Sequence, residues 1–158
     1  MQNTKISMFE EGNILYFNPF YFENGNKPKP KYFLILKSME DNLIIASLPT
    51  SHDHVPNSME KKHGCIDDYT INFNCCYFQE GKNVAFNEKD SCNFSFPKDT
   101  YIYGYRISFF DKRKFDEQLA ASETILTYKG KLYTEEMKQL YKCLRNSSSV
   151  KRMFRKLL

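Results

Sequence analysis

Hydrophobic residues in the first third of the chain form short β-rich runs separated by polar segments. The run over residues 12–22 (GNILYFNPFYF) has apolar side chains on both of its alternating faces, as in a strand that is buried on both sides. Two further apolar runs, at residues 32–37 and 42–48, are separated by a short polar turn. Together these runs predict a three-stranded antiparallel meander.

The middle of the chain continues the strand pattern. Strand-like runs follow one another at residues 69–78, 83–86, 93–96 and 101–110. Gly104 interrupts the last run, which indicates a bulge or a point where another part of the chain comes close. Residues 49–63 show no sustained period of either kind, and we interpret them as a loop that holds most of the polar chemistry.

The C-terminal part of the chain has helical spacing instead. Residues 112–121 form one predicted helix. A second helix is predicted to begin with Thr134 as its N-cap and to carry an apolar stripe from Met137 to Leu144. Residues 150–157 repeat that spacing among basic side chains. Strands that precede helices predict an α+β or small-barrel domain, mainly β, with C-terminal helices.

Length and composition favour one globular domain. The 158 residues are 41% hydrophobic and 27% charged, which is ordinary for a folded chain and excludes disordered and fibrous classes. No apolar run approaches the roughly 18 residues of a membrane-spanning helix, and the first residues lack the pattern of a secretory signal. We therefore expect a cytoplasmic protein without membrane contact.

The basic character of the chain belongs to one terminal segment. The formal charge is +4, yet residues 142–158 carry six basic side chains and no acidic one. Residues 1–141 therefore have a charge of −2, the difference between +4 and +6. We expect the terminal helix to pack its apolar face on the domain or on a second subunit. Its basic face then lies in solvent or against an acidic partner, in preference to RNA.

Five cysteines without a secretory signal predict thiols in a reducing compartment, not a disulfide framework. The histidines and cysteines between residues 52 and 76 raise the question of zinc. However, the chain has no cysteine pair two to four residues apart, and adjacent Cys75 and Cys76 point to opposite faces of a strand. We therefore expect neither a metal site nor a cofactor.

Two loop segments carry the candidate chemistry. The sequence KPKPK at residues 27–31 places Lys27, Lys29 and Lys31 on a stiff, extended loop. The sequence PTSHDH at residues 49–54 places hydroxyls, a carboxylate and imidazoles directly after a buried strand. Groups at a strand end are held by the sheet while they face solvent, which favours binding and catalysis.

Together these groups suit the cleavage of a phosphodiester. A ribonuclease without a metal must deprotonate a 2′-hydroxyl, stabilise charge on phosphorus and protonate the leaving oxygen. His52 or His54 could transfer protons near neutral pH. Thr50 or Ser51 could donate a hydrogen bond, and the loop lysines could hold the phosphate. The same residues also fit a solvated loop, so the residue types alone leave both interpretations open.

Several segments occur in a combination that is typical of one family. The order is FEEGNILYFNPF at residues 9–20, the Lys/Pro loop, YFLILK at residues 32–37 and IIASLPTS at residues 44–51. A further segment, KDTYIYGYRISFFDKRKF, covers residues 98–115. These segments resemble the PemK/MazF toxins of bacterial toxin–antitoxin systems, in which a closing helix follows the last strand.

The resemblance implies an SH3-like small barrel, usually a homodimer, that cleaves single-stranded RNA without a metal and is neutralised by an antitoxin. The loop arginine of the family falls on Lys31 by strand register, or on Lys29 if Pro30 sets the match. Its strand-end Thr or Ser falls on Thr50 or Ser51. Lysine in place of arginine is a departure, because it offers a point charge and no planar fork.

The expected domain has a barrel core at residues 9–51 and 98–110, an extra hairpin inserted at residues 60–96 and C-terminal helices at residues 112–158. The first functional hypothesis is a metal-independent endoribonuclease toxin. Its catalytic candidates are Lys31, Thr50, Ser51, His52 and His54, and its nucleic-acid contacts are Lys27, Lys29 and Lys31. The alternative is a catalytically silent small-barrel module that binds nucleic acid or a protein partner.

Overall fold

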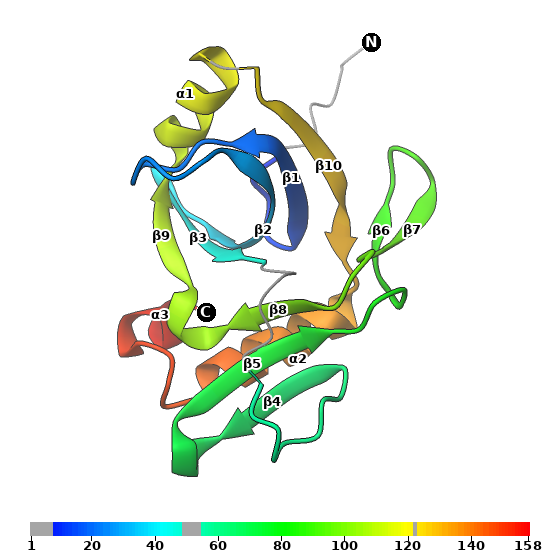
Figure 1. The fold of residues 1–158 in the computed structure, drawn as a ribbon, viewed down its shortest axis with the longest axis vertical. Helices are drawn as coiled ribbons and strands as arrows, with labels where there is room; N and C mark the ends of the chain where they lie inside the picture. Colours follow the sequence, from blue (N-terminus) through cyan, green and yellow to red (C-terminus); the bar gives the residue numbers. More distant parts are fainter. Residues whose placement is uncertain (1–7, 49–54, 122) are drawn as a thin grey trace.

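The computed structural model describes residues 8–48, 55–121 and 123–158. Strands make up 42% of the structure and helices 23%, so the predicted mainly β class is confirmed. The strands form two antiparallel sheets, and the larger one lies between α1 (Lys112–Ala121) and the smaller sheet (Figure 1).

The larger sheet has seven strands and contains the N-terminal meander. In spatial order they are β7 (Cys92–Ser95), β6 (Asn83–Asn87), β10 (Ile125–Leu132), β1 (Asn13–Phe20), β2 (Lys29–Ser38), β3 (Asn42–Ser47) and β9 (Ser108–Asp111). β1 pairs with β2 and β2 with β3, which confirms the predicted meander. The prediction of helices throughout residues 112–158 is wrong, because β10 lies within this range. β10 forms there because it pairs with the backbone groups on the other edge of β1.

The smaller sheet has three strands, in the order β4 (Gly64–Asp68), β5 (Phe73–Phe78) and β8 (Thr100–Tyr103). β4 and β5 form a hairpin around a 3₁₀ turn, η1 (Tyr69–Ile71), so the start of the run at residues 69–78 is a turn and not a strand. β6 and β7 form another hairpin. Residues 60–96 thus hold two hairpins where the sequence predicts one.

The apolar run at residues 101–110 is two strands and not one. β8 ends at Tyr103, a second 3₁₀ turn, η2 (Gly104–Arg106), follows, and the chain then enters the larger sheet as β9. A β-carbon at position 104 would overlap with Asn74 and lie 2.7 Å from Val150 Cγ2. The prediction that Gly104 marks a close approach is therefore confirmed.

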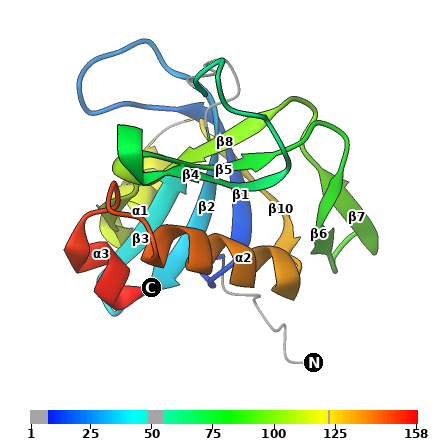
Figure 2. The same ribbon diagram turned by 90° about the horizontal axis from the view of Figure 1, so that it is seen from below.

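Both faces of the central strands of the larger sheet are buried, as the alternation in the first strand predicts. Ile14 belongs to a cluster that the smaller sheet, α2 (Thr134–Arg145) and α3 (Arg152–Leu157) complete. Leu15 and Phe17 belong to a second cluster on the opposite face, which α1 covers through Phe115. Figure 2 shows α2 and α3 next to each other, with α1 behind them.

The C-terminal helices pack on the domain through their apolar stripes, as predicted. Leu144 of α2 is buried, and Phe154 of α3 packs against Phe109 in a tilted arrangement with ring centroids 4.9 Å apart. Most basic side chains of α3 are exposed. The N-cap of α2 is Tyr133, without a side-chain hydrogen bond, which corrects the prediction of Thr134 as the cap.

A disulfide joins Cys65 of β4 to Cys143 of α2. The prediction of five thiols is therefore wrong. The two cysteines are 78 positions apart in the sequence, and they meet because α2 packs against the β4–β5 hairpin. The remaining three cysteines keep their thiols; Cys75 and Cys76 are buried and Cys92 is exposed.

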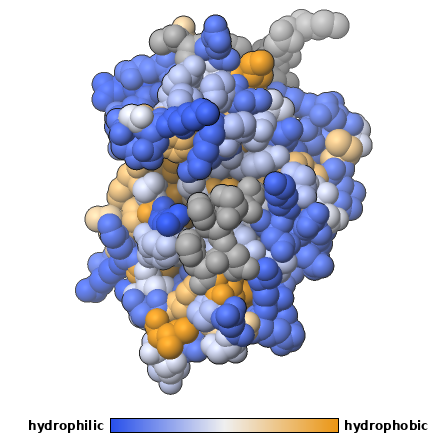
Figure 3. Space-filling model, viewed as in Figure 1, coloured by the Kyte–Doolittle hydropathy of each residue, from blue (hydrophilic) through white to orange (hydrophobic). Residues whose placement is uncertain are grey.

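Three further features concern the sheet edges, the surface and the helices. Among the described residues the strands form no closed barrel, and the larger sheet ends in β7 on one side and β9 on the other. The face seen in Figure 3 is mainly hydrophilic, with separate apolar patches. Across residues 8–48, 55–121 and 123–158, no helix combines the length and the apolar character needed to cross a membrane.

Candidate nucleic-acid interface

Four strands begin or end at the same end of the larger sheet. β1 ends at Phe20, opposite Lys29, the first residue of β2. Phe33 of β2 faces Ser47 at the end of β3, and β9 begins at Ser108, which pairs with β3. We call this the loop end of the larger sheet, because the β1–β2 loop and the segment after β3 both leave from it.

Two lysines of the predicted loop lie against aromatic rings at the loop end. The Lys31 Nζ is 5.0 Å from the centroid of the Phe22 ring and 5.9 Å from that of Phe33. The Lys29 Nζ is 5.8 Å from the same Phe22 ring. A ring face attracts an ammonium through its negative quadrupole. Phe22 therefore holds both cations near one place.

A third cation, Arg106, reaches the loop end from a different segment. η2 turns the chain from β8 into β9, which leaves Arg106 two residues before β9 begins. The guanidinium carbon is 5.4 Å from the centroid of the Tyr105 ring and 6.0 Å from that of Tyr103. We call Lys29, Lys31 and Arg106 the cationic cluster.

The three charges of the cationic cluster affect one another. Burial lowers the pKa of the Lys31 ammonium below its ordinary value, and the charges of Lys29 and Arg106 lower it further. Among residues 8–48, 55–121 and 123–158, no carboxylate forms an ion pair with any member of the cluster. Because like charges repel, such a cluster favours an anion that several of its members can reach.

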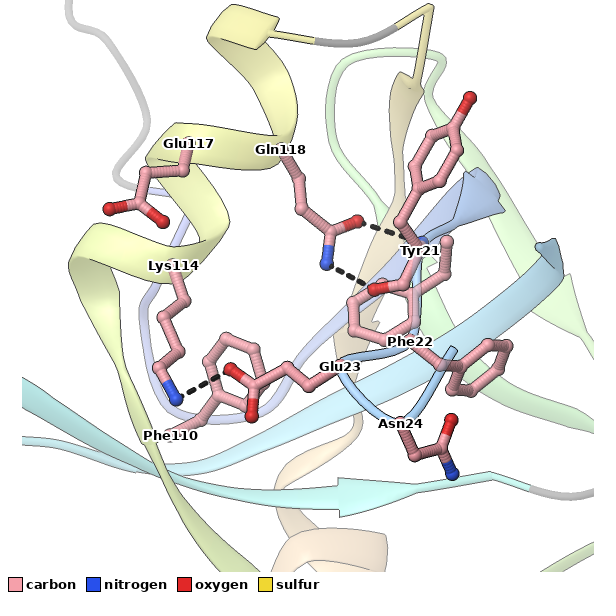
Figure 4. Close-up of a pocket in the computed structure, with 9 residues that line it drawn as sticks. Tyr21, Phe22, Glu23, Asn24, Phe110, Lys114, Glu117 and Gln118 are labelled. Carbon is pink, nitrogen blue, oxygen red and sulfur yellow. Dashed lines mark hydrogen bonds and ion pairs between the residues drawn. The ribbon is translucent and has the colours of Figure 1, made fainter. Parts of the chain in front are cut away.

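A pocket of about 510 Å³ lies beside the end of β1, and Figure 4 shows residues that line it. It lies between the end of β1, the first residues of the β1–β2 loop, and α1. Phe20, Phe22 and Phe110 give it an apolar lining. Phe22 thus belongs both to the pocket and to the cation-binding rings, so the two features are continuous.

Two contacts from α1 fix the walls of the pocket. The Gln118 side chain accepts a hydrogen bond from the Tyr21 N–H at 3.1 Å and donates one to the Tyr21 carbonyl oxygen at 2.9 Å. The Lys114 Nζ lies 2.5 Å from a Glu23 carboxylate oxygen. These contacts join α1 to the residues that follow β1. Because Tyr21 and Glu23 flank Phe22 in the sequence, the contacts also restrain Phe22.

The predicted site residues fall into two groups. Lys29 and Lys31 come together, but they lie in β2 and not in a loop as predicted, whereas Lys27 is exposed in the loop before them. The other four lie outside the described residues: Thr50, Ser51, His52 and His54. The chain reaches that segment from Leu48, whose N–H donates a hydrogen bond to the Tyr32 carbonyl oxygen at 3.1 Å. β3 therefore ends beside the residue that follows Lys31.

The third histidine of the chain has a structural role. The Gln79 N–H donates a hydrogen bond to His63 Nδ1 at 3.1 Å, so the proton of the neutral ring is on Nε2. This Nε2 lies 2.8 Å from Glu136 Oε1, and it donates to that carboxylate. The two side chains are only 9% and 14% exposed. His63 thus joins the β4–β5 region to α2 and is not part of the cationic cluster.

Sequence reasoning missed Arg106 and Phe22. Arg106 is hidden in an apolar run, and the glycine two residues before it was the one signal of a turn there. Phe22 is the last residue of the predicted first strand, but β1 ends at Phe20, and the Phe22 ring lies beside the two lysines instead. No protein-family model, curated protein or solved structure matches this chain.

Proposed function

We propose that the protein binds single-stranded RNA at the cationic cluster and cleaves it without a metal ion, as the PemK/MazF resemblance implies. One observation carries this proposal: Lys29, Lys31 and Arg106 gather at the loop end without an acidic partner among the described residues. Such a cluster attracts the phosphates of a nucleic acid, and the aromatic rings around it can stack on unpaired bases.

Arg106 supplies the chemical group that the loop lacks. The family's loop arginine is replaced by lysine here, which offers a point charge only. A guanidinium from η2 at the same end of the sheet would give the phosphate a planar pair of donors, while the lysines neutralise its charge. The arginine of the proposed site thus comes from a different strand connection than the resemblance implies.

The cleavage step of the proposal is a transfer of the phosphoryl group within the RNA. The 2′-oxygen loses its proton and forms a bond to phosphorus, while the bond from phosphorus to the 5′-oxygen breaks and that oxygen is protonated. The products are a 2′,3′-cyclic phosphate and a 5′-hydroxyl. His52 or His54 would transfer the protons, and Thr50 or Ser51 would donate a hydrogen bond to the phosphate.

Further parts of the proposal follow from the resemblance alone. They are an SH3-like small-barrel arrangement of the curled sheet, a homodimer, an acidic antitoxin as partner and a cytoplasmic location. The exposed basic side chains of α3 offer a surface with the charge that an acidic partner needs. Sedimentation of the purified protein tests the homodimer, and a monomer at micromolar concentration would contradict it.

A cleavage assay in a chelator tests the proposed activity. The wild-type protein is incubated with long single-stranded RNA in EDTA, and we expect fragments with cyclic phosphate ends. Lys31→Ala, and Lys29→Ala with Lys31→Ala, should abolish them. Lys138→Ala is the matched control, because Lys138 is an exposed lysine paired with Glu135 on α2. Intact RNA at micromolar protein, or activity that survives the double substitution, would overturn the proposal.

The second candidate function is binding without cleavage. It is favoured by the composition of the described part of the interface, which offers cations and aromatic rings, the groups that bind a nucleic-acid chain. Filter binding to a labelled 20-nucleotide RNA separates the two candidates. Binding that weakens with salt while the RNA stays intact would support a silent module and not a nuclease.

A further inference from the structure

Phe22 links a pocket to two cations. It lines the pocket between β1 and α1, and the ammoniums of Lys29 and Lys31 lie within 5.8 Å of its ring centroid. A nucleotide has two corresponding parts, a flat base and an anionic phosphate, joined by one sugar. We propose that this pocket binds one unstacked nucleobase while the lysines hold the adjoining phosphate. This inference rests on the proposed binding of single-stranded RNA.

The lining of the pocket suits a base. Its volume of about 510 Å³ lies in the range of ordinary ligand sites. The half-buried Phe22 and Phe110 offer ring surfaces for stacking, which every base accepts because every base has a π face. Polar groups of Asn24 and Glu117 also line the pocket, and such groups pair with the edge of a base.

The distance between the lysine and the pocket also fits a nucleotide. The Lys31 Nζ is 5.0 Å from the Phe22 centroid, so a phosphate held by this lysine lies about one ring away from the pocket. The two hydrogen bonds between Gln118 and Tyr21 join α1 to the residue before Phe22 at the wall of the pocket. The two lysines require an anion at this side of the pocket, which a nucleotide supplies and an apolar peptide side chain does not.

A comparison of two short oligomers tests the inference. One is a hexamer of 2′-O-methyladenosine, and the other is an abasic 2′-O-methyl chain of the same length. The 2′-O-methyl groups remove the attacking hydroxyl, so binding is measured without cleavage. We expect the wild-type protein to bind the adenosine hexamer about 5- to 150-fold more tightly, the effect of stacking one base.

Two substitutions in α1 test whether the preference for the adenosine hexamer arises at the pocket. Glu117→Trp places a large ring at the pocket, whereas Asp116→Trp makes the same change one residue away, at an exposed position outside it. The chain has no native tryptophan, so each variant also reports its own environment by fluorescence. We expect Glu117→Trp to reduce the ratio of the two dissociation constants several-fold, and Asp116→Trp to keep the wild-type ratio. Circular dichroism confirms that both variants fold.

The outcomes separate this inference from the proposed function. If neither oligomer binds, RNA binding itself fails. If both bind equally, the cationic cluster holds the phosphates but the pocket holds no base. If the adenosine hexamer is preferred and Glu117→Trp leaves that preference unchanged, the base stacks elsewhere. Each of the last two results would overturn the pocket assignment while the binding of RNA stands.

Discussion

The backbone of Gly104 lies directly against the Asn74 side chain. A β-carbon at position 104 would overlap with Asn74 Oδ1 and lie 2.7 Å from Val150 Cγ2. Asn74 is itself fixed, because its Nδ2 donates to Asp67 at 3.1 Å and to the Cys143 carbonyl oxygen at 3.3 Å. Gly104 is also the first residue of η2, the turn that delivers Arg106 to the loop end.

Gly104→Ala should therefore weaken both the fold and the cationic cluster. Overpacking of this kind costs about 1–3 kcal/mol of the free energy of unfolding, which urea denaturation measures. We also expect weaker binding of RNA, because η2 must shift. Ser108→Ala, at an exposed position of β9, should change the free energy of unfolding by less than about 0.5 kcal/mol. Equal free energies of unfolding for Gly104→Ala and Ser108→Ala would show that η2 has space for a β-carbon.

If RNA binds at the cationic cluster as proposed, Arg106→Ala should reduce the number of neutralised phosphates by one. The slope of the logarithm of the RNA binding constant against the logarithm of salt concentration should then become less steep by about 0.7, the value for one phosphate of a single strand. The substitution also removes one charge that lowers the pKa of Lys31, so that pKa should rise, as NMR titration of the lysine can measure. Lys62→Ala, in an exposed pair with Glu60, should leave both quantities unchanged.

The disulfide predicts a definite number of thiols. Oxidised protein unfolded in denaturant should react at three cysteines, and reduced protein at five. Replacing Cys65 and Cys143 together by alanine should cost about 2–4 kcal/mol of the free energy of unfolding, because the bond closes a long loop. Cys92→Ala, at an exposed position, is the matched control. Five reactive thiols without reductant would contradict the disulfide.

The packing of α3 can be tested with two neighbouring residues. Phe154 is 4% exposed and its ring packs against that of Phe109, whereas Met153 is 54% exposed. Phe154→Ala should lower the free energy of unfolding by about 3–5 kcal/mol, and Met153→Ala should have little effect. If Phe154→Ala leaves stability unchanged but weakens RNA binding, α3 contacts RNA and does not support the fold.

Stability at extreme pH should depend on Tyr77 and Asp99. Burial, together with the hydrogen bond to Asp99, raises the pKa of Tyr77 to about 12. The contribution of neutral Tyr77 is therefore complete below pH 10 and is lost as the pH rises towards 12. The Glu80 N–H and the Tyr77 hydroxyl lower the pKa of Asp99. Its contribution is complete above the unfolded value of 3.8 and is lost as the pH falls further.

Tyr77→Phe separates the two effects. It should remove the alkaline loss of stability between pH 10 and 12 that the wild-type protein shows in thermal melts. Asp99 keeps its hydrogen bond from Glu80 at 2.9 Å in this variant, so most of the acid dependence should remain. If the variant still loses stability between pH 10 and 12, groups other than Tyr77 cause that loss.

The sequence by itself determined the local elements whose pattern is unambiguous. The alternation of Ile14 and Leu15 predicted a strand buried on both faces, and the helical spacing up to Leu144 predicted the packed face of α2. Gly104 indicated the close approach correctly. The strand and the helix are visible in the sequence because side-chain periodicity depends on neighbours within a few residues. Gly104 is visible because a missing side chain marks a close approach, although its partners, Asn74 and Val150, are remote in the sequence.

The tertiary structure alone decided which distant segments meet. Cys65 and Cys143 pair because α2 packs under β4, and Arg106 joins Lys31 because one apolar run leaves the smaller sheet and enters the larger one. Such contacts depend on strand pairing and packing between remote elements, which no local pattern encodes. Thus the hydrophobic alternation set the strands, and the order in which they pair set the proposed interface.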